Sequence, residues 1–255
     1  MALYENERVS VIIPVYKVER FIEQTILSVV SQNYPDIEVV LVDDCTPDNS
    51  ATIIKRLQKK YSNIVYHKLE KNSGAAVARN KALDIATGRY VAFLDGDDMW
   101  AEGKLEKQMT FIKKHNAAIS CTAMDTVDEA GNALGSVRNV QEKITYRFLL
   151  HNTMIATSTT IVDRNQTGDF QMPLRRGGQD YATWLMLMRN GTMCWGFDEV
   201  LSHYRVVSGS LSSNKWKSIR QVWEIQTVNE RINKVSAAMN VCFFVVNGFI
   251  KHFVK

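Results

Sequence analysis

The feature that most constrains the fold is an alternation, in the first part of the chain, between short apolar runs and segments with helical periodicity. The apolar runs occupy residues 9–14, 37–42, 63–69 and 90–94. Helices are predicted between them, over residues 18–32, around Ile53, Ile54 and Leu57, and over residues 75–86. This order predicts an α/β fold with a mostly parallel nucleotide-binding sheet flanked by helices.

The pattern changes after about residue 120. Residues 129–132 predict a hairpin turn, and the β-branched run at 157–162 predicts a strand. An amphipathic helix is predicted over residues 181–189 and ends at Asn190-Gly191. We therefore expect this part to be attached to the first, without forming an independent domain.

Composition and the chain start exclude several classes of protein. Hydrophobic residues make up 45% of the chain and charged residues 23%, as in ordinary globular proteins. The four cysteines include no C-x-x-C pair, so neither a disulfide framework nor a zinc site is indicated. Residues 1–7 lack the basic and apolar regions of a secretory signal, so a cytoplasmic location is expected.

The last part of the chain is basic. Residues 214–255 contain seven Lys or Arg and two Glu. This balance favours an anionic membrane as partner over nucleic acid, since no nucleic-acid recognition motif is present. Residues 214–235 are a predicted helix, and the apolar residues of 241–250 are too few to span a bilayer. Two interpretations stay open: an interfacial helix, or a helix packed on the protein or on a second subunit.

Acidic residues follow two of the predicted strands. Asp43-Asp44 come after one, and Asp95-Gly96-Asp97-Asp98 after another. Ligands of open α/β sheets bind outside the carboxyl ends of the strands, so both groups point to one crevice. The first pair also suits an ordinary turn or helix cap. In the second group the carboxylates repel one another unless a cation neutralises them, and oxygen ligands suit Mg²⁺ or Mn²⁺.

Four segments in this order resemble the inverting glycosyltransferases of family 2, which have the GT-A fold. The segments are residues 9–15, 39–50, 72–80 and 91–98. The similarity continues through 178–181 and 203–205, so it covers about residues 8–215. Residues 175–185 and 210–215 are most similar to bacterial transferases of teichuronic-acid, capsule or lipopolysaccharide assembly.

The resemblance implies both an organisation and an activity. It implies a nucleotide-sugar-binding half at 1–120, an acceptor-binding half at 121–213 and a basic helical tail at 214–255. It implies a metal-dependent transfer of a sugar, with inversion, from a nucleotide diphosphate such as a UDP-sugar. The acceptor is expected to be a hydroxyl of a bacterial surface polysaccharide or lipid-linked glycan. That places the enzyme in the cytoplasm, at the inner face of the cell membrane.

The family roles also transfer to matching residues. Asp97 is expected to bind the Mn²⁺ or Mg²⁺ ion that bridges the diphosphate, and Asp95 to face the ribose. A base contact is expected for Asp43 or Asp44. The remaining donor-site residues are Pro14, Val15 and Tyr16 in the base pocket, Gly96 between the two aspartates, Arg79 at the base or diphosphate, and Arg205 at the diphosphate. From the local sequence alone, Arg79 also suits a solvated helix position.

Two further expectations concern the end of the donor site and the acceptor side. Arg205 precedes a Ser- and Gly-containing segment, residues 208–213, that resembles a mobile closing loop, and a plain surface loop is the alternative. Asp180 matches the family's catalytic base, which deprotonates the acceptor hydroxyl. The family usually has Glu-Asp here, and this chain has Gln179-Asp180. The alternative role for Asp180 is a helix N-cap.

Two other functions fit parts of the pattern. A sugar nucleotidyltransferase usually carries a glycine-rich phosphate loop after its first strand, whereas residues 14–19 of this chain contain no glycine. A non-catalytic nucleotide-sugar-binding protein would keep Asp44 and Asp97 without needing a base, so the presence of Asp180 argues against it.

Overall fold

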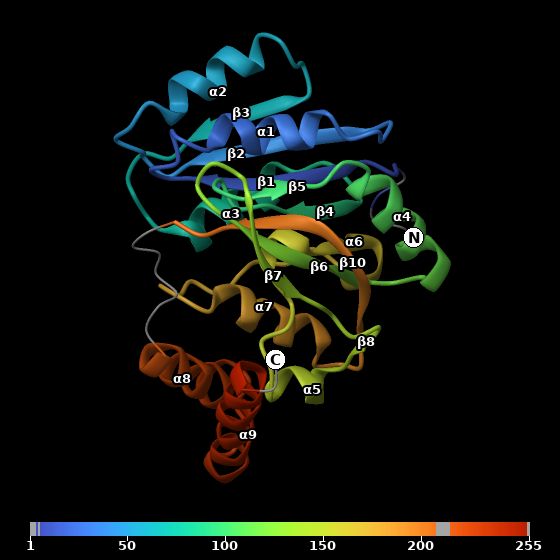
Figure 1. Cartoon of the computed structure of the whole chain (residues 1–255), viewed down its shortest axis with the longest axis vertical. Helices are drawn as coiled ribbons and strands as arrows, with labels where there is room; N and C mark the ends of the chain where they lie inside the picture. The colour runs from blue at the N-terminus through green and yellow to red at the C-terminus, as the bar shows by residue number, and fades with distance from the viewer. Residues whose placement is uncertain (1–3, 5, 208–214, 254–255) are drawn as a thin grey trace.

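A ten-stranded sheet forms the centre of the protein, whose computed structural model describes residues 4, 6–207 and 215–253 (Figure 1). The order along the sheet is β3-β2-β1-β4-β9-β6-β10-β5, with β7 paired to β6 and β8 paired to β10. The first four strands pair in parallel, and they are β1 (Val9–Val15), β2 (Ile37–Asp43), β3 (Ile64–Lys68) and β4 (Tyr90–Phe93). The predicted α/β class is confirmed.

Helices cover both faces of these strands, as side-chain alternation requires. On one face, Val11 and Ile13 of β1 pack with α1 (Ile22–Val30) and α2 (Ser50–Gln58). On the other face, Ile12 packs in one cluster with α3 (Ala75–Ile85) and α7 (Gln179–Met188). The short parallel strands are thus buried on both sides, which explains their continuous apolar sequence.

The later strands add antiparallel pairs to this mostly parallel sheet. β4 pairs antiparallel with β9 (Ile161–Asp163), and β9 pairs antiparallel with β6 (Ile119–Val127). β10 (Cys194–Arg205) is parallel to β6. The remaining elements are β5 (Met99–Trp100), α4 (Lys104–His115), β7 (Ala133–Arg138), β8 (Lys143–Ile144), α5 (Tyr146–Leu150) and α6 (Arg164–Thr167). The sheet therefore continues across residue 120 without a break.

The strand predicted over residues 157–162 is wrong in its first half. Residues Thr157–Thr159 form a 3-10 turn, η1, and β9 begins only at Ile161. The hydroxyls of Thr159 and Thr160 both donate to the carbonyl of Ala156 at 2.8 Å. Such side-chain bonds to the local backbone compete with strand pairing.

The C-terminal region consists of two helices separated by a break. α8 (Lys215–Glu224) runs into a π-helical segment (Ile225–Asn229), and α9 (Lys234–Phe253) follows a turn in which Arg231 has φ 54°. The single helix predicted over 214–235 is thus interrupted. Val222, Ile225 and Ala237 are buried, so the helices pack on the body, and α9 projects from it (Figure 1). Within the described residues, no helix has the length and apolarity to cross a membrane.

Candidate active site

The carboxyl end of β4 carries the turn Asp95–Asp98. Asp95 forms an ion pair with Arg79 of α3, which is only 5% exposed. Burial opposes the charge of Arg79, but the carboxylates of Asp95, Asp180 and Asp97 outweigh this and raise its pKa. Arg79 therefore lies buried beneath the three carboxylates, and the alternative of a solvated helix residue is wrong. Its predicted contact with the base or diphosphate stays a prediction.

Asp95 and Asp97 offer the donor set that a hard divalent cation prefers. Burial and the adjacent charge of Asp95 raise the pKa of Asp97 to about 6, because two neighbouring carboxylates repel each other. A cation would relieve that repulsion, so these residues fit Mg²⁺ or Mn²⁺. No three acidic, His or Cys side chains of the described residues converge as a complete cage. An ion here would need ligands from a bound substrate.

The third acid of the turn, Asp98, is turned into the protein and is 2% exposed. Its Oδ2 accepts from Ser158 Oγ at 2.5 Å, and its Oδ1 accepts from the backbone N–H of Arg205 at 3.0 Å. Burial, with the charges of Asp95 and Asp97, raises its pKa well above the usual range. Asp98 thus stabilises the Asp95–Asp98 turn through hydrogen bonds to buried groups.

Arg205, at the end of β10, lies beside the Asp95–Asp98 turn. Its side chain is buried, with 1% of the residue exposed. Its Nε donates to Asp97 O at 2.8 Å, Nη1 to Glu129 O at 2.6 Å and Nη2 to Gln24 Oε1 at 2.8 Å. In this geometry the guanidinium holds the backbone of the Asp97 turn, and its contact with a diphosphate stays a prediction. Residues 208–213, predicted to form a loop that closes over the donor, lie outside the described residues.

The two acids at the end of β2, Asp43 and Asp44, both bind protein groups. Asp43 is fully buried, and it accepts from Thr46 N at 2.7 Å and from Tyr66 OH at 2.6 Å. It therefore shapes the loop and offers no surface to a base. Asp44 accepts from the N–H groups of Ser73 and Gly74 at 2.6 and 2.8 Å, at the start of α3. The base contact remains a prediction for Asp44.

The end of β1 lies against the Asp95–Asp98 turn. Tyr16 is 43% exposed there, whereas Val15 is buried. Gly96 allows the close approach, because a Cβ at this position would lie 3.1 Å from Pro14 O and 3.2 Å from Val18 Cγ2. Thus the predicted residues of β1 and β4 are brought together, and Tyr16 has the side chain that a ligand can reach.

Asp180 lies in the first turn of α7 and does not cap that helix. The N-cap is Gly178, with φ 66° and no side chain, so the cap interpretation of Asp180 is wrong. Its Oδ2 accepts from Thr157 Oγ1 at 3.2 Å. Within the described part of the chain, Oδ1 receives no hydrogen bond. Since the charges of Asp180 and Asp95 both act on Arg79, the two acids lie near the same guanidinium, and we call the group of Asp95, Asp97, Asp180 and Arg79 the acidic crevice.

Sequence reasoning missed the residues that hold these acids in place. Thr157 and Ser158 looked like members of a strand, yet their hydroxyls contact Asp180 and Asp98. Arg138 of β7 was also missed, and the charge of Asp180 acts on it. An unexplained polar run before an apolar strand is the signal that could have identified the first two.

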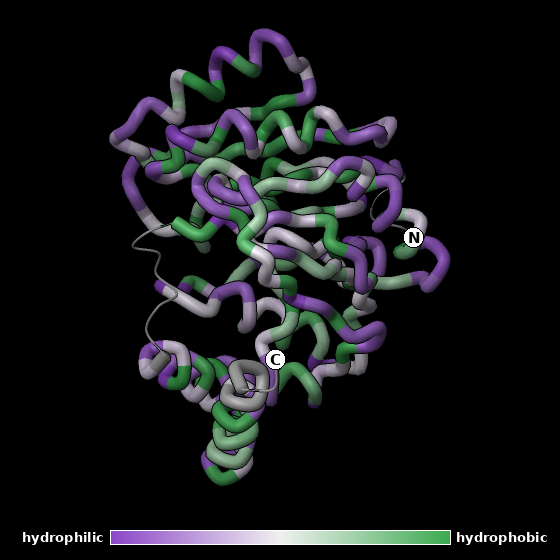
Figure 2. The backbone as a smooth tube through the Cα atoms, in the orientation of Figure 1, coloured by the Kyte–Doolittle hydropathy of each residue, from purple (hydrophilic) through white to green (hydrophobic). Residues whose placement is uncertain are grey.

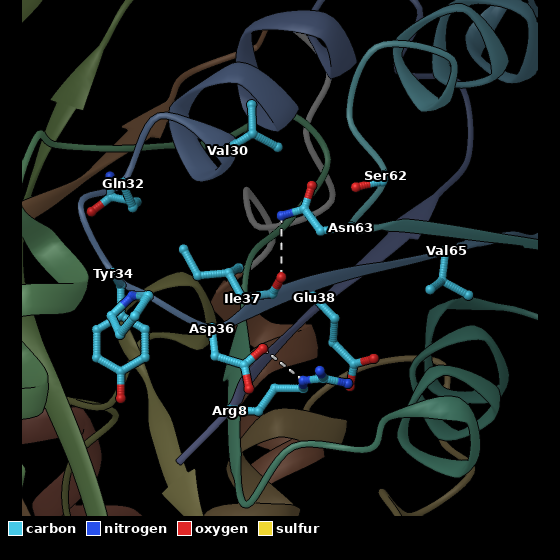
Figure 3. Close-up of a pocket in the computed structure, with 11 residues that line it drawn as sticks. Arg8, Val30, Gln32, Tyr34, Asp36, Ile37, Glu38, Ser62, Asn63 and Val65 are labelled. Atoms are coloured by element: carbon cyan, nitrogen blue, oxygen red, sulfur yellow. Dashed lines mark hydrogen bonds and ion pairs between the residues drawn. The ribbon is translucent and has the colours of Figure 1, made fainter. Parts of the chain in front are cut away.

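A separate cavity of about 460 Å³ lies at the opposite ends of the parallel strands (Figure 3). Arg8, Asp36 and Asn63 line it at the amino ends of the parallel strands. Arg8 Nε pairs with Asp36 at 2.8 Å, and Asn63 donates to Ile37 O. A seven-residue strand is about 20 Å long, so this cavity is distinct from the acidic crevice.

The chain is similar in sequence to two bacterial proteins that are named as glycosyltransferases. TuaG of Bacillus subtilis (strain 168), which is named for teichuronic acid biosynthesis, is 44% identical over 235 residues, 92% of each chain. WfaP of Escherichia coli, named as a UDP-Glc:alpha-D-GlcNAc-diphosphoundecaprenol beta-1,3-glucosyltransferase, is 34% identical over 247 residues, 96% of each chain.

Solved structures show the same fold. S. aureus TarS 1–349 in complex with UDP-GlcNAc aligns with a TM-score of 0.72 at 22% identity, over 93% of this chain and 71% of that one. A mannosyltransferase from Pyrobaculum calidifontis, in complex with GDP-Man and Mn²⁺, aligns with a TM-score of 0.67 at 16% identity, over 94% and 71%. The GT-A fold predicted from the sequence is confirmed.

The family model described as Glycosyl transferase family 2 matches residues 10–205, a range that begins in β1 and ends at Arg205 with β10. This range contains every residue of the acidic crevice. The chain therefore belongs to glycosyl transferase family 2.

Proposed function

We propose that the enzyme transfers a sugar from a UDP-sugar to a hydroxyl of a lipid-linked glycan, with inversion and with a divalent metal ion. The observation that carries this proposal is the grouping of Asp95, Asp97 and Asp180 around the buried Arg79. One crevice thereby holds both a cation-binding pair and a separate carboxylate available to accept a proton.

The donor side uses the Asp95–Asp97 pair and the end of β1. Asp97 and Asp95 would hold Mn²⁺ or Mg²⁺, which neutralises the charge that develops on a diphosphate leaving group. Tyr16 is exposed beside the turn and offers a ring face to the base. The UDP-GlcNAc complex of TarS and the donor in the name of WfaP support a UDP-linked sugar.

On the acceptor side, Asp180 is the proposed base. Thr157 orients one carboxylate oxygen by a hydrogen bond, which leaves the other oxygen to accept the proton of the attacking hydroxyl. Attack from the side opposite the leaving group inverts the anomeric carbon. The names of TuaG and WfaP support an acceptor of bacterial polysaccharide assembly, and that of WfaP a lipid-linked one.

A lipid-linked acceptor suits an enzyme that rests on a membrane, and α9 presents a surface for this. Its exposed apolar residues are 51–74% exposed and recur at helical spacing: Val235, Met239, Phe243 and Val246. Ala237, Val241 and Phe244 lie on the opposite side and pack toward the core. Exposed Arg231 and Lys234 flank the apolar stripe, and Figure 2 shows apolar colour along the projecting helix. We infer an anionic lipid surface as partner.

The test is release of UDP from a panel of UDP-sugars, with Mn²⁺ or with a chelator, and with or without a lipid-linked glycan. Acceptor-dependent release with Mn²⁺ is expected. Asp180→Asn should lower turnover roughly 10²–10⁴-fold and leave donor binding nearly unchanged, because it removes the base without changing side-chain volume. Retained turnover in this variant would exclude Asp180 as the base. Formation of a UDP-sugar from UTP would instead identify a nucleotidyltransferase.

A further inference from the structure

The two functional parts of the crevice are attached to one short turn, η1. Ser158 Oγ donates to Asp98 Oδ2 at 2.5 Å and accepts from the backbone N–H of Asp95 at 3.1 Å. The preceding residue, Thr157, donates to Asp180 Oδ2 at 3.2 Å. Adjacent hydroxyls therefore contact the metal-binding turn and the base.

The turn is itself fixed by buried donors from other elements. Ser158 O accepts from Trp100 Nε1 at 2.8 Å and from Ser202 Oγ at 3.1 Å. Thr159 O accepts from Gln108 Nε2 at 3.0 Å. Hydrogen bonds shielded from water hold their partners rigidly, so η1 keeps the hydroxyls of Thr157 and Ser158 in fixed positions.

Asp98 connects the rigid η1 turn to Asp97, the adjacent acid that we propose as a metal ligand. Ser158 holds one carboxylate oxygen of Asp98, and the backbone of Arg205 holds the other. The side chain of Arg205 in turn binds Asp97 O. Without the serine hydroxyl, Asp98 keeps a buried oxygen unpaired, and the turn loses its link to η1.

We propose that Ser158 is a positioning residue that orients the Asp95–Asp97 pair for metal binding, while Thr157 orients Asp180. This inference rests on the proposed metal-dependent transfer. It assigns the fixed placement of the two functional groups to η1, a turn of three buried residues.

The test of Ser158 is the Mn²⁺ affinity of the folded protein in the presence of the donor UDP-sugar, measured by calorimetry. Ser158→Ala is expected to weaken Mn²⁺ binding roughly 10- to 100-fold, because a buried oxygen of Asp98 is left without its hydrogen bond. Ser158→Thr keeps the hydroxyl and should recover most of the affinity. Asp98→Asn, which conserves volume, is a second variant with the same expected loss if Ser158→Ala does not fold.

Ser10→Ala is the matched control, because Ser10 is also buried and its hydroxyl also donates to a carboxylate, Glu38, near the cavity of Figure 3. Its Mn²⁺ affinity should equal that of the wild type. Wild-type-like affinity in Ser158→Ala and Asp98→Asn overturns the role of Ser158. Failure of the wild type to bind Mn²⁺ overturns the proposed function itself, and this inference with it.

The role of Thr157 has its own readout. Thr157→Val removes the donor that orients Asp180 and should lower kcat by about tenfold, while KM for the UDP-sugar stays near its wild-type value. Mn²⁺ affinity should not change, and Thr157→Ser should restore kcat. An unchanged kcat, or a loss of donor and Mn²⁺ binding that matches the loss of kcat, would overturn the assignment of Thr157.

Discussion

Asp97 is half-buried beside another carboxylate, so the metal binding that we propose for it should depend on pH. Its pKa is raised to about 6 by burial and by Asp95, so protons compete with metal below that pH. We expect Mn²⁺ affinity, measured with a UDP-sugar present, to be constant above pH 7 and to fall about tenfold per unit below pH 6. Asp97→Ala should abolish Mn²⁺-dependent turnover. If the Mn²⁺ affinity does not change between pH 5 and 7, the assignment of Asp97 as a metal ligand is contradicted.

The buried environment of Lys104 predicts how the stability of the protein depends on pH. It is fully buried, its Nζ donates to Gln108 Oε1 and to Thr159 O, and burial lowers its pKa to about 7. The unfolded lysine has a pKa of about 10.4, so between these values the unfolded chain binds more protons and stability rises with pH. Lys104→Met should therefore gain stability relative to the wild type at pH 6.5, and this advantage should be clearly smaller at pH 9.

Urea unfolding at both pH values measures this difference. The control is Lys107→Met, because Lys107 is half-exposed on the same helix and pairs with Glu199. That variant should show nearly the same pH slope as the wild type. If Lys104→Met also keeps the wild-type slope, the buried amine is not the group that titrates.

At the scale of elements, the start of α7 depends on its contact with the C-terminal helices. Gly178 has φ 66°, and a Cβ there would lie 2.8 Å from Ile225 Cδ1 in the π-helical segment. Gly178→Ala should cost about 1–3 kcal/mol of stability through strain and overpacking. It should also lower turnover, because Asp180 lies two residues further on.

Gly168→Ala separates the effect of backbone strain from that of the clash with Ile225. Gly168 has φ 73° and open space around its Cα, so this variant has the strain without the clash. It should lose less stability than Gly178→Ala and keep full turnover. Equal losses in both variants, by thermal unfolding and by UDP release, would mean that the contact with Ile225 contributes nothing.

The elements predictable from the sequence are those with local signals. β1 to β4 and the helices between them follow from β-branched runs and helical spacing, and the family resemblance identifies the acids that we propose as metal ligands at the strand ends. The break before α9 was not predictable, because it depends on packing of Ile225 and Ala237 against the body. The roles of Asp43 and Asp98 were not predictable either. A carboxylate after a strand has the same local sequence whether it faces a crevice or a buried hydroxyl such as that of Ser158.

For the molecule as a whole, the C-terminal region has one side packed on the body and one side exposed. One side of α9 is held on the body, where Asn240 donates to Gln226 and Asn247 donates to His151 O. The other side keeps its apolar stripe exposed. Deleting 238–255 would therefore expose core residues, so substitutions on the exposed side are the sharper test of membrane binding.

The last prediction concerns that exposed side of α9. Met239→Ser with Phe243→Ser should reduce binding to vesicles containing anionic lipid by roughly tenfold or more, since each buried apolar side chain contributes about 1.5–3 kcal/mol. Binding of the wild type should weaken at high salt, because its basic residues attract the headgroups. Leu134→Ser with Val137→Ser is the control, because these exposed apolar residues lie on β7. Equal vesicle binding by all three proteins in a cosedimentation assay would exclude the α9 surface. A dimer that only the α9 substitutions dissociate would identify a second copy as its partner.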